Sequence, residues 1–194
     1  MRRIQPGVSF HIEISTSSDI VRAVAQQIVP FGLCLLPKPI PTIACHFLFR
    51  ETFGIFCGRS HHLAGVREVS IESIRSEPWV AFASETLEPF VALRLGASIT
   101  NRLAATSCDL QEVRRFISVG AGTGVLPLAA ARRDAAEGGL WQLPIYDTGE
   151  LRADLCFIYH PAAQHTPAEL AFRQKVLRFK MSDTVVDSRG EPFS

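Results

Sequence analysis

The sequence predicts an α/β protein with mainly parallel sheets, arranged as two lobes joined by two crossover strands. Short apolar runs of strand length alternate with amphipathic segments of helix length along the whole chain. Prolines and glycines mark the boundaries between these segments. With 194 residues, of which 47% are hydrophobic and 20% charged, the chain can bury a core in one domain or in two small lobes.

The beginning of the chain predicts a β-α-β unit. Residues Val8–Ile14 alternate apolar and polar side chains, which is typical of a strand with one covered face. Residues 19–29 place apolar side chains at helical spacing up to Pro30, and residues 31–36 form a continuous apolar run. Such a unit predicts parallel pairing between its two strands.

The remaining elements alternate in the same way. The last one is an amphipathic helix, in which Thr166 serves as the cap and Glu169 stands at the capping-box position. We expect strands over residues 47–56, 79–83, 102–106, 124–127, 140–143 and 155–160, and helices over residues 71–75, 89–95, 109–119, 128–136 and 166–179.

The segment Ser107–Pro127, SCDLQEVRRFISVGAGTGVLP, is the most informative part of the chain. Asp109 can cap a helix, and Glu112 can reach back to the N–H of Asp109. Gly120 or Gly122 supplies the positive φ that ends the helix, and a short strand follows up to the proline. The helix N-terminus offers unpaired N–H groups to an anionic ligand.

The glycines of this segment resemble a dinucleotide-binding loop only superficially. A dinucleotide site runs from strand to glycine turn to helix with the spacing G-x-G-x-x-G. Here the helix precedes the glycines, and the spacing is G-x-G-x-G. We therefore interpret the glycines as a helix end followed by the start of a strand, and expect no nucleotide.

Charge and composition limit the classes of partner. A net charge of +1, with arginine pairs that look like solvated helix faces, predicts no DNA binding by this chain alone. No apolar run reaches the length of a membrane span, and no export signal follows Met1. Five widely spaced cysteines suit a reducing compartment, so we expect a cytoplasmic protein without a membrane partner.

Metal binding and catalysis find little support in the sequence. Cys45 with His46, and Cys57 with His61 and His62, carry ligand types of zinc, but no C-x-x-C pair accompanies them. We also find no G-x-S-x-G turn, no paired carboxylates and no cysteine in a clearly activating setting, with Cys108 interpreted as a buried residue at the helix start. We therefore expect no metal, no cofactor and no enzymatic activity.

Several segments, in order, resemble the effector-binding domain of LysR-type transcriptional regulators, which has the fold of type 2 periplasmic binding proteins. These segments are PGVSFHIEISTSSDIVRAV, FGLCLLPKP, RETFGIFCGRSHHLAG, EPWVAF and DLQEVRRFISVGAGTGVLP. Two family features lack a counterpart: the helix-turn-helix with its linker helix, and the strand and helix that precede PGVSF. Val29-Pro30-Phe31 also stands where the family has an acidic residue. We therefore expect an N-terminally truncated regulator with an incomplete first lobe.

The resemblance implies a domain division and a function. The first lobe would comprise residues 1–50 and 155–180, the second residues 51–154, and residues 181–194 a tail. A small organic effector would bind between the lobes, DNA would be reached only through the missing helix-turn-helix, and the domain would form homo-oligomers. The alternatives are a free-standing solute-binding protein and a non-catalytic fragment of the same fold.

By position, the resemblance places six residues in the effector cleft. The serines near helix starts have capping as an alternative role, and the phenylalanine has core packing. The six candidates are Ser15, Thr16, Ser17, Ser84, Phe90 and Ser107.

Overall fold

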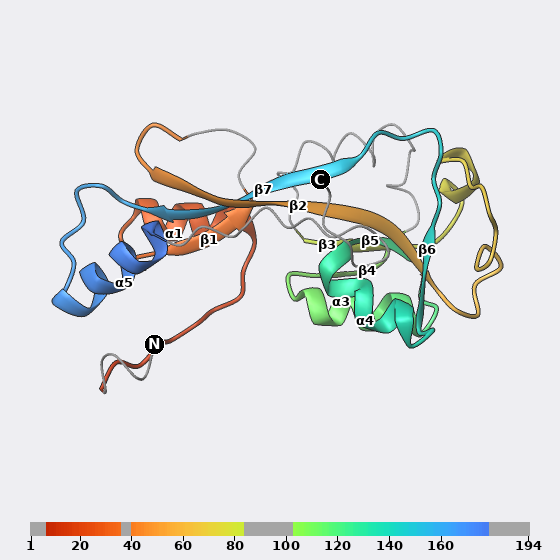
Figure 1. The fold of residues 1–194 in the computed structure, drawn as a ribbon, viewed down its shortest axis with the longest axis horizontal. Helices are drawn as coiled ribbons and strands as arrows, with labels where there is room; N and C mark the ends of the chain where they lie inside the picture. The colour runs from red at the N-terminus through yellow and green to blue at the C-terminus, as the bar shows by residue number, and fades with distance from the viewer. Residues whose placement is uncertain (1–6, 36–39, 84–102, 179–194) are drawn as a thin grey trace. The chain divides into compact units, whose positions relative to one another are not determined.

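The computed structural model of the chain describes residues 7–35, 40–83 and 103–178 (Figure 1). Its contacts divide the chain into two compact units. Unit 1 takes its described residues from 7–13, 19–49 and 154–178, and unit 2 from 14–18 and 50–153. Two long strands, β2 (Ala44–Gly58) and β7 (Leu151–Tyr159), run from one unit into the other.

Unit 1 is a small sheet with helices α1 (Ser17–Ala25) and α5 (Pro167–Leu177). Strand β1 (Gly32–Leu35) pairs antiparallel with β7, which lies next to β2. Apolar side chains of α1 pack on the sheet through Val24, because the 3.6-residue period places them on one face of the helix. The buried residues of this cluster are Val24, Cys34, Ile43, Cys156 and Ile158.

An aromatic group joins β7 and the segment before β1 to α5. The ring of Phe31 lies 5.2 Å from that of Phe157 and 5.4 Å from that of Phe172. Helix α5 begins with the predicted capping box, since the Thr166 hydroxyl accepts the Glu169 N–H and the Glu169 carboxylate accepts the Thr166 N–H. The capping-box prediction is confirmed.

Unit 2 is a mixed sheet that is covered on both faces. Its strand order is β2-β5-β3-β4, and β6 also pairs with β2. The two pairs that include β3 are parallel, whereas β2 is antiparallel to β5 and β6. The elements are η1 (Glu72–Ile74), β3 (Trp79–Phe82), β4 (Leu103–Ser107), α3 (Leu110–Ser118), β5 (Thr123–Pro127), α4 (Leu128–Ala136) and β6 (Leu140–Leu143).

Two apolar cores lie on either side of this sheet. Helices α3 and α4 cover one face, seen below the strands in Figure 1, with Val113, Ile117 and Ala131 as buried contacts. On the other face, Val69 and Ile74 from the segment around η1 pack against Ile55 and Trp79. Because both faces are covered there, the central strands β3 and β5 bury successive side chains on both sides.

The α/β class is confirmed, but the pairing differs from the prediction. We expected mainly parallel sheets, whereas the sheet is mixed, and strands β2 and β7 make antiparallel pairs. The parallel pairing of β1 in a β-α-β unit is wrong as well, since β1 pairs antiparallel with β7. Alternating elements predict a class, but they do not fix which distant strand becomes the neighbour.

The predicted strand over Val8–Ile14 is also wrong. These residues form no strand, and the side chains of Phe10, Ile12 and Ile14 are 52%, 81% and 63% exposed. Phe10 has an aromatic contact, with its ring 5.4 Å from that of Phe172. Alternation shows that a segment suits a strand, but a strand also needs a backbone neighbour to complete its hydrogen bonds.

The observed bounds of α3, α4 and β6 agree closely with the predicted ones, whereas those of α1 differ. Helix α4 and strand β6 have the predicted bounds, and α3 ends before Gly120, whose φ is +87°. Helix α1 is shorter than predicted and ends at Ala25, before Gln27 takes a φ of +57°. The helix expected over residues 89–95 lies outside the described residues. Within the described ranges, none of the helices combines the length and apolarity that crossing a bilayer demands.

Candidate functional site

The carboxyl ends of β3 and β4 lie side by side in unit 2. The two strands are parallel, with Phe82 opposite Ser107, and the Ala83 N–H donates to the Ser107 carbonyl at 2.9 Å. Helix α3 begins three residues after this pair. We call residues Ser107–Gln111 the β4–α3 corner. In α/β folds, strand ends of this kind are where ligands bind.

Side chains of the corner organise the start of the helix. The Ser107 hydroxyl accepts the N–H of Asp109 at 3.0 Å, and the Asp109 carboxylate accepts the N–H of Gln111 at 2.7 Å. Asp109 is therefore the helix cap, as predicted. The predicted bond from Glu112 back to Asp109 is absent at this described helix start, because Ser107 takes that N–H and Glu112 pairs with Arg115 at 2.8 Å.

The corner offers mainly hydrogen-bond donors to a ligand. Ser107 is half-buried, and its hydroxyl uses one acceptor site for Asp109, so its O–H hydrogen can still donate. The first turn of α3 adds backbone N–H groups and the positive end of the helix dipole. This combination suits a carboxylate or phosphate oxygen.

The glycines behind the corner allow the close approach of backbones. A Cβ at Gly122 would lie 2.3 Å from the Pro78 carbonyl oxygen, and one at Gly124 would lie 2.5 Å from that of Val80. Strand β5 therefore packs directly against β3 and the residue before it. The interpretation of this segment as a helix end and a strand start is confirmed, with Gly120 as the residue of positive φ.

The six candidate residues fall into three groups. Ser107 is the first residue of the β4–α3 corner. Ser17 is buried, with 8% exposure, as the first residue of α1, and the half-buried Ser15 and Thr16 precede it. By its contacts the segment 14–18 belongs to unit 2, the unit that contains Ser107. The remaining two, Ser84 and Phe90, lie outside the described residues.

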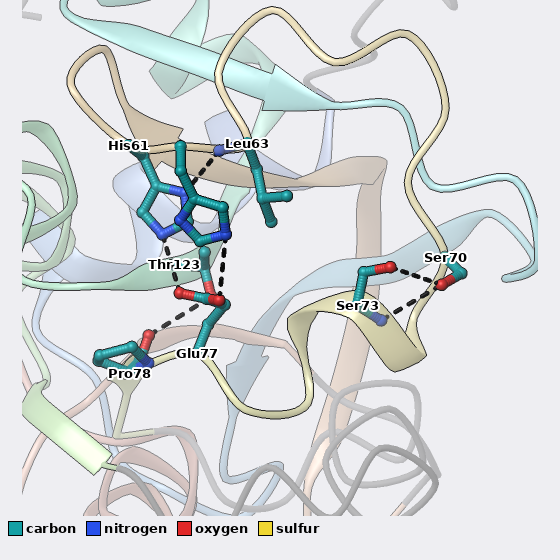
Figure 2. Close-up of polar contacts among 8 residues, drawn as sticks. His61, Leu63, Ser70, Ser73, Glu77, Pro78 and Thr123 are labelled. Atoms are coloured by element: carbon teal, nitrogen blue, oxygen red, sulfur yellow. Dashed lines mark hydrogen bonds and ion pairs between the residues drawn. The ribbon is translucent and has the colours of Figure 1, made fainter.

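A second polar group, which we call the His61–Glu77 clasp, lies at the other end of β3 and was not predicted. The His61 Nε2 is 3.1 Å from a Glu77 carboxylate oxygen, and the His61 Nδ1 accepts the Leu63 N–H at 3.2 Å (Figure 2). The next residue, Pro78, accepts the Thr123 N–H at 2.8 Å through its carbonyl oxygen. The clasp therefore fixes the chain just before β3 and beside β5.

The donor set of the clasp resembles that of a metal site. Ligand atoms of His61, His62 and Glu77 all lie within 4.8 Å of one another. However, a His61 Nδ1 that accepts an N–H leaves the ring proton on Nε2, so Nε2 donates to Glu77 and has no lone pair for a cation. We interpret the group as a hydrogen-bonded clasp.

Cys57, which the sequence placed beside these histidines, is fully buried in the core of unit 2. Burial raises the pKa of its thiol to about 11, and the nearby Glu77 carboxylate adds to this effect. The thiol is therefore protonated at neutral pH and behaves as a small core side chain.

Comparison with known proteins identifies the family. Residues 1–179 match the family described as the LysR substrate binding domain. The chain belongs to this family. It has the family's type 2 periplasmic-binding-protein-like fold, and the predictions of family, fold and effector-binding function are confirmed. The members are regulatory ligand-binding domains and not enzymes. A search of curated proteins found no match.

Solved structures of LysR regulators share the fold at low sequence identity. The effector-binding domain of QuiR in complex with shikimate has a TM-score of 0.69 and 15% identity, covering 84% of this chain and 78% of that one. The Synechocystis CcmR regulatory domain in complex with 2-PG has a TM-score of 0.73 and 15% identity, with coverage of 91% and 85%. The MetR regulatory domain from Neisseria meningitidis has a TM-score of 0.69 and 17% identity, with coverage of 91% and 82%.

Proposed function

We propose that this LysR substrate-binding domain senses a small organic acid, which it holds at the β4–α3 corner of unit 2. The observation that carries the proposal is the arrangement of Ser107 and the first turn of α3 at the ends of two parallel strands. A carboxylate or phosphate would accept from these donors. The Asp109 carboxylate can accept from a hydroxyl of the same ligand, which favours hydroxylated acids.

The remaining contacts of the effector are proposed from the resemblance of the sequence to the effector-binding domain of LysR-type regulators. Units 1 and 2 would be the two lobes, with Ser15, Thr16, Ser17, Ser84 and Phe90 as further contacts. Binding would shift the lobes between two arrangements, and an attached helix-turn-helix would transmit that shift to DNA. The regulator would act in the cytoplasm as a homo-oligomer assembled through this domain.

Titration calorimetry of a Ser107 variant tests the site. A panel of hydroxylated carboxylates and phosphates, beginning with shikimate and 2-PG, is first screened by the rise in melting temperature. For a ligand that binds, Ser107→Phe should raise Kd at least about tenfold, or about 1.4 kcal/mol, because the ring fills the space beside the helix start. The helix content should persist, since Asp109 still caps α3.

The neighbouring residue supplies a matched control. Thr106 is exposed, and its side chain points to the opposite face of β4 from that of Ser107, so Thr106→Phe adds the same ring on the wrong side. It should leave Kd within about twofold of the wild-type value. Equal affinities for the two variants would remove the corner from the site.

A further inference from the structure

Two features of the structure lack the backbone neighbour that a sheet supplies. The first is the segment of residues 8–14, which we call the free arm and which makes no backbone hydrogen bond to any other described residue. The second is the outer edge of β1, the last strand in the sheet order, which pairs only with β7 among the described strands. An unpaired strand edge is a template for the addition of a further strand.

The free arm already has the geometry of a strand. Its backbone has neither a turn nor a bend, and Figure 1 draws it as a red line without an arrow. The side chains of His11 and Glu13 lie on one side of it, with the His11 Nε2 3.0 Å from a Glu13 carboxylate oxygen. Side chains two residues apart share a side when the backbone is extended, as in a strand. The arm can therefore join a sheet without a change of its backbone conformation.

The other side of the free arm is apolar and exposed. Phe10, Ile12 and Ile14 are 52%, 81% and 63% exposed. At roughly 200 Å² for a fully exposed side chain of this size, the three offer about 400 Å² per chain. Two arms would then bury about 800 Å², or about 1,600 Å² with the surfaces that they cover, which is the size of a standard stable interface.

The edge of β1 also presents apolar side chains on one face. Leu33 is 56% exposed and lies directly opposite the buried Phe157. The ring of Phe31, two residues before Leu33, lies 5.2 Å from that of Phe157 and 5.4 Å from that of Phe172, so it belongs to the same face. The Phe10 ring lies 5.4 Å from the same Phe172. Phe10 is therefore a suitable neighbour for the aromatic group at this edge.

We propose that the free arm of one copy of this chain pairs with the outer edge of β1 in a second copy, and that the second copy returns the same contact. The pairing is parallel, because this direction places Phe10 beside Phe31 and the aromatic group. Two residues further along each strand, Ile12 then lies beside Leu33. Since each copy gives one arm and receives one, the two contacts form a closed dimer.

A second copy of the chain is the partner that both features select. Each chain carries one free arm and one free edge, so two copies leave neither of them unpaired. A different protein that added a strand to β1 would leave the arm exposed. With a net charge of +1, two copies repel each other only weakly. The inference deepens the proposed function, on whose homo-oligomer it rests, but the contact needs no effector.

Sedimentation of the full chain tests the association. We expect the wild-type chain to change from monomer to dimer with a Kd on the order of 10 µM, because the loss of rotational and translational freedom offsets part of the burial. Ile12→Lys places a charge on the apolar side of the arm and should raise Kd at least about 100-fold. Ser9→Lys adds the same charge on the polar side and is the matched control, with Kd within about threefold of the wild-type value. Urea unfolding below about 1 µM then reports the monomer, in which Ile12 is exposed.

Disulfide trapping identifies the contact. A chain with Ile12→Cys is mixed with a chain with Leu33→Cys and oxidised, and mass spectrometry of the digested dimer detects the joined peptides. A disulfide between positions 12 and 33 joins two chains, because neither chain carries both substitutions. We expect it in most of the dimer, whereas Ser9→Cys, on the opposite side of the arm, should give less than about a tenth of that yield.

Several results would overturn the proposal. They are a chain that stays monomeric at about 100 µM, a wild-type Kd in Ile12→Lys, and a dimer without a disulfide between positions 12 and 33. Equal yields from positions 9 and 12 would also overturn it, because they indicate random collision. A chain that carries both Ile12→Cys and Leu33→Cys, and forms the disulfide as a monomer, would show pairing within one chain instead. All of these results leave the effector site at the β4–α3 corner intact, which the Ser107→Phe titration tests separately.

Discussion

Residues 8–14 and residues 107–127 both carry regular patterns, yet only the second segment folds as its pattern predicts. The first alternates like a strand but forms none, and Ile12 is 81% exposed. The second forms α3 and β5 close to their predicted bounds. The difference lies in where the hydrogen-bond partners are. A helix finds its partners within its own segment, whereas a strand depends on a neighbour elsewhere in the chain.

The largest effect should come from the glycines of the well-predicted segment. Gly122→Ala places a methyl group 2.3 Å from the Pro78 carbonyl oxygen, so β5 has to move away from the residue before β3. We expect a loss of about 3 kcal/mol or more in the free energy of unfolding, measured in urea. Gly149→Ala, with nothing within 4 Å of its added methyl group, should change the same quantity by less than about 0.5 kcal/mol.

An equal substitution in the two segments compares them directly. Ile117 is a fully buried residue of α3, whereas Ile12 is largely exposed. Ile117→Ala should cost about 3 kcal/mol of unfolding free energy through lost burial and the cavity left behind, and Ile12→Ala less than about 0.5 kcal/mol. A large loss in Ile12→Ala would show that residues 8–14 are buried in solution, and the comparison would fail.

The smallest effect separates the two predicted bonds at the start of α3, of which the one to Asp109 is observed and the one from Glu112 is not. Asp109→Ala removes the acceptor of the Gln111 N–H and should cost about 1 kcal/mol. Glu112→Ala should cost less than about 0.5 kcal/mol, because Glu112 makes an exposed ion pair with Arg115 and no cap bond. Similar costs in the two variants, measured by urea unfolding, would instead indicate that the capping box forms in solution.

These contrasts explain how much of the fold could be predicted. Some residues act on backbone groups within a few residues of themselves, so their roles can be predicted from the sequence. Examples are Asp109, Gly120 and Thr166. The antiparallel pairing of β1 with β7 could not be predicted from the sequence. Residues 8–14 carry an equally good strand pattern and were therefore an equally suitable partner for β1.

The candidate site likewise contains features that could be predicted from the sequence and features that could not. Ser107 could be found because it stands at a predicted junction of strand and helix. The contact of Gly122 with Pro78, and the clasp between His61 and Glu77, join residues of different elements, and only the fold brings them together. The adjacency of His61 and His62 was visible, but Glu77 carries no local signal that would select it as their partner.

The division of the chain between the units has a consequence for the order of folding. Strands β3 to β6 find all their described partners within residues 50–153, so unit 2 can complete its pairing as soon as that stretch has been synthesised. Strand β1 has to wait for β7, more than a hundred residues later. Distant pairing of this kind slows folding. Unit 2 should therefore fold first on the ribosome, while β1 and the thiol of Cys34 stay exposed until β7 emerges.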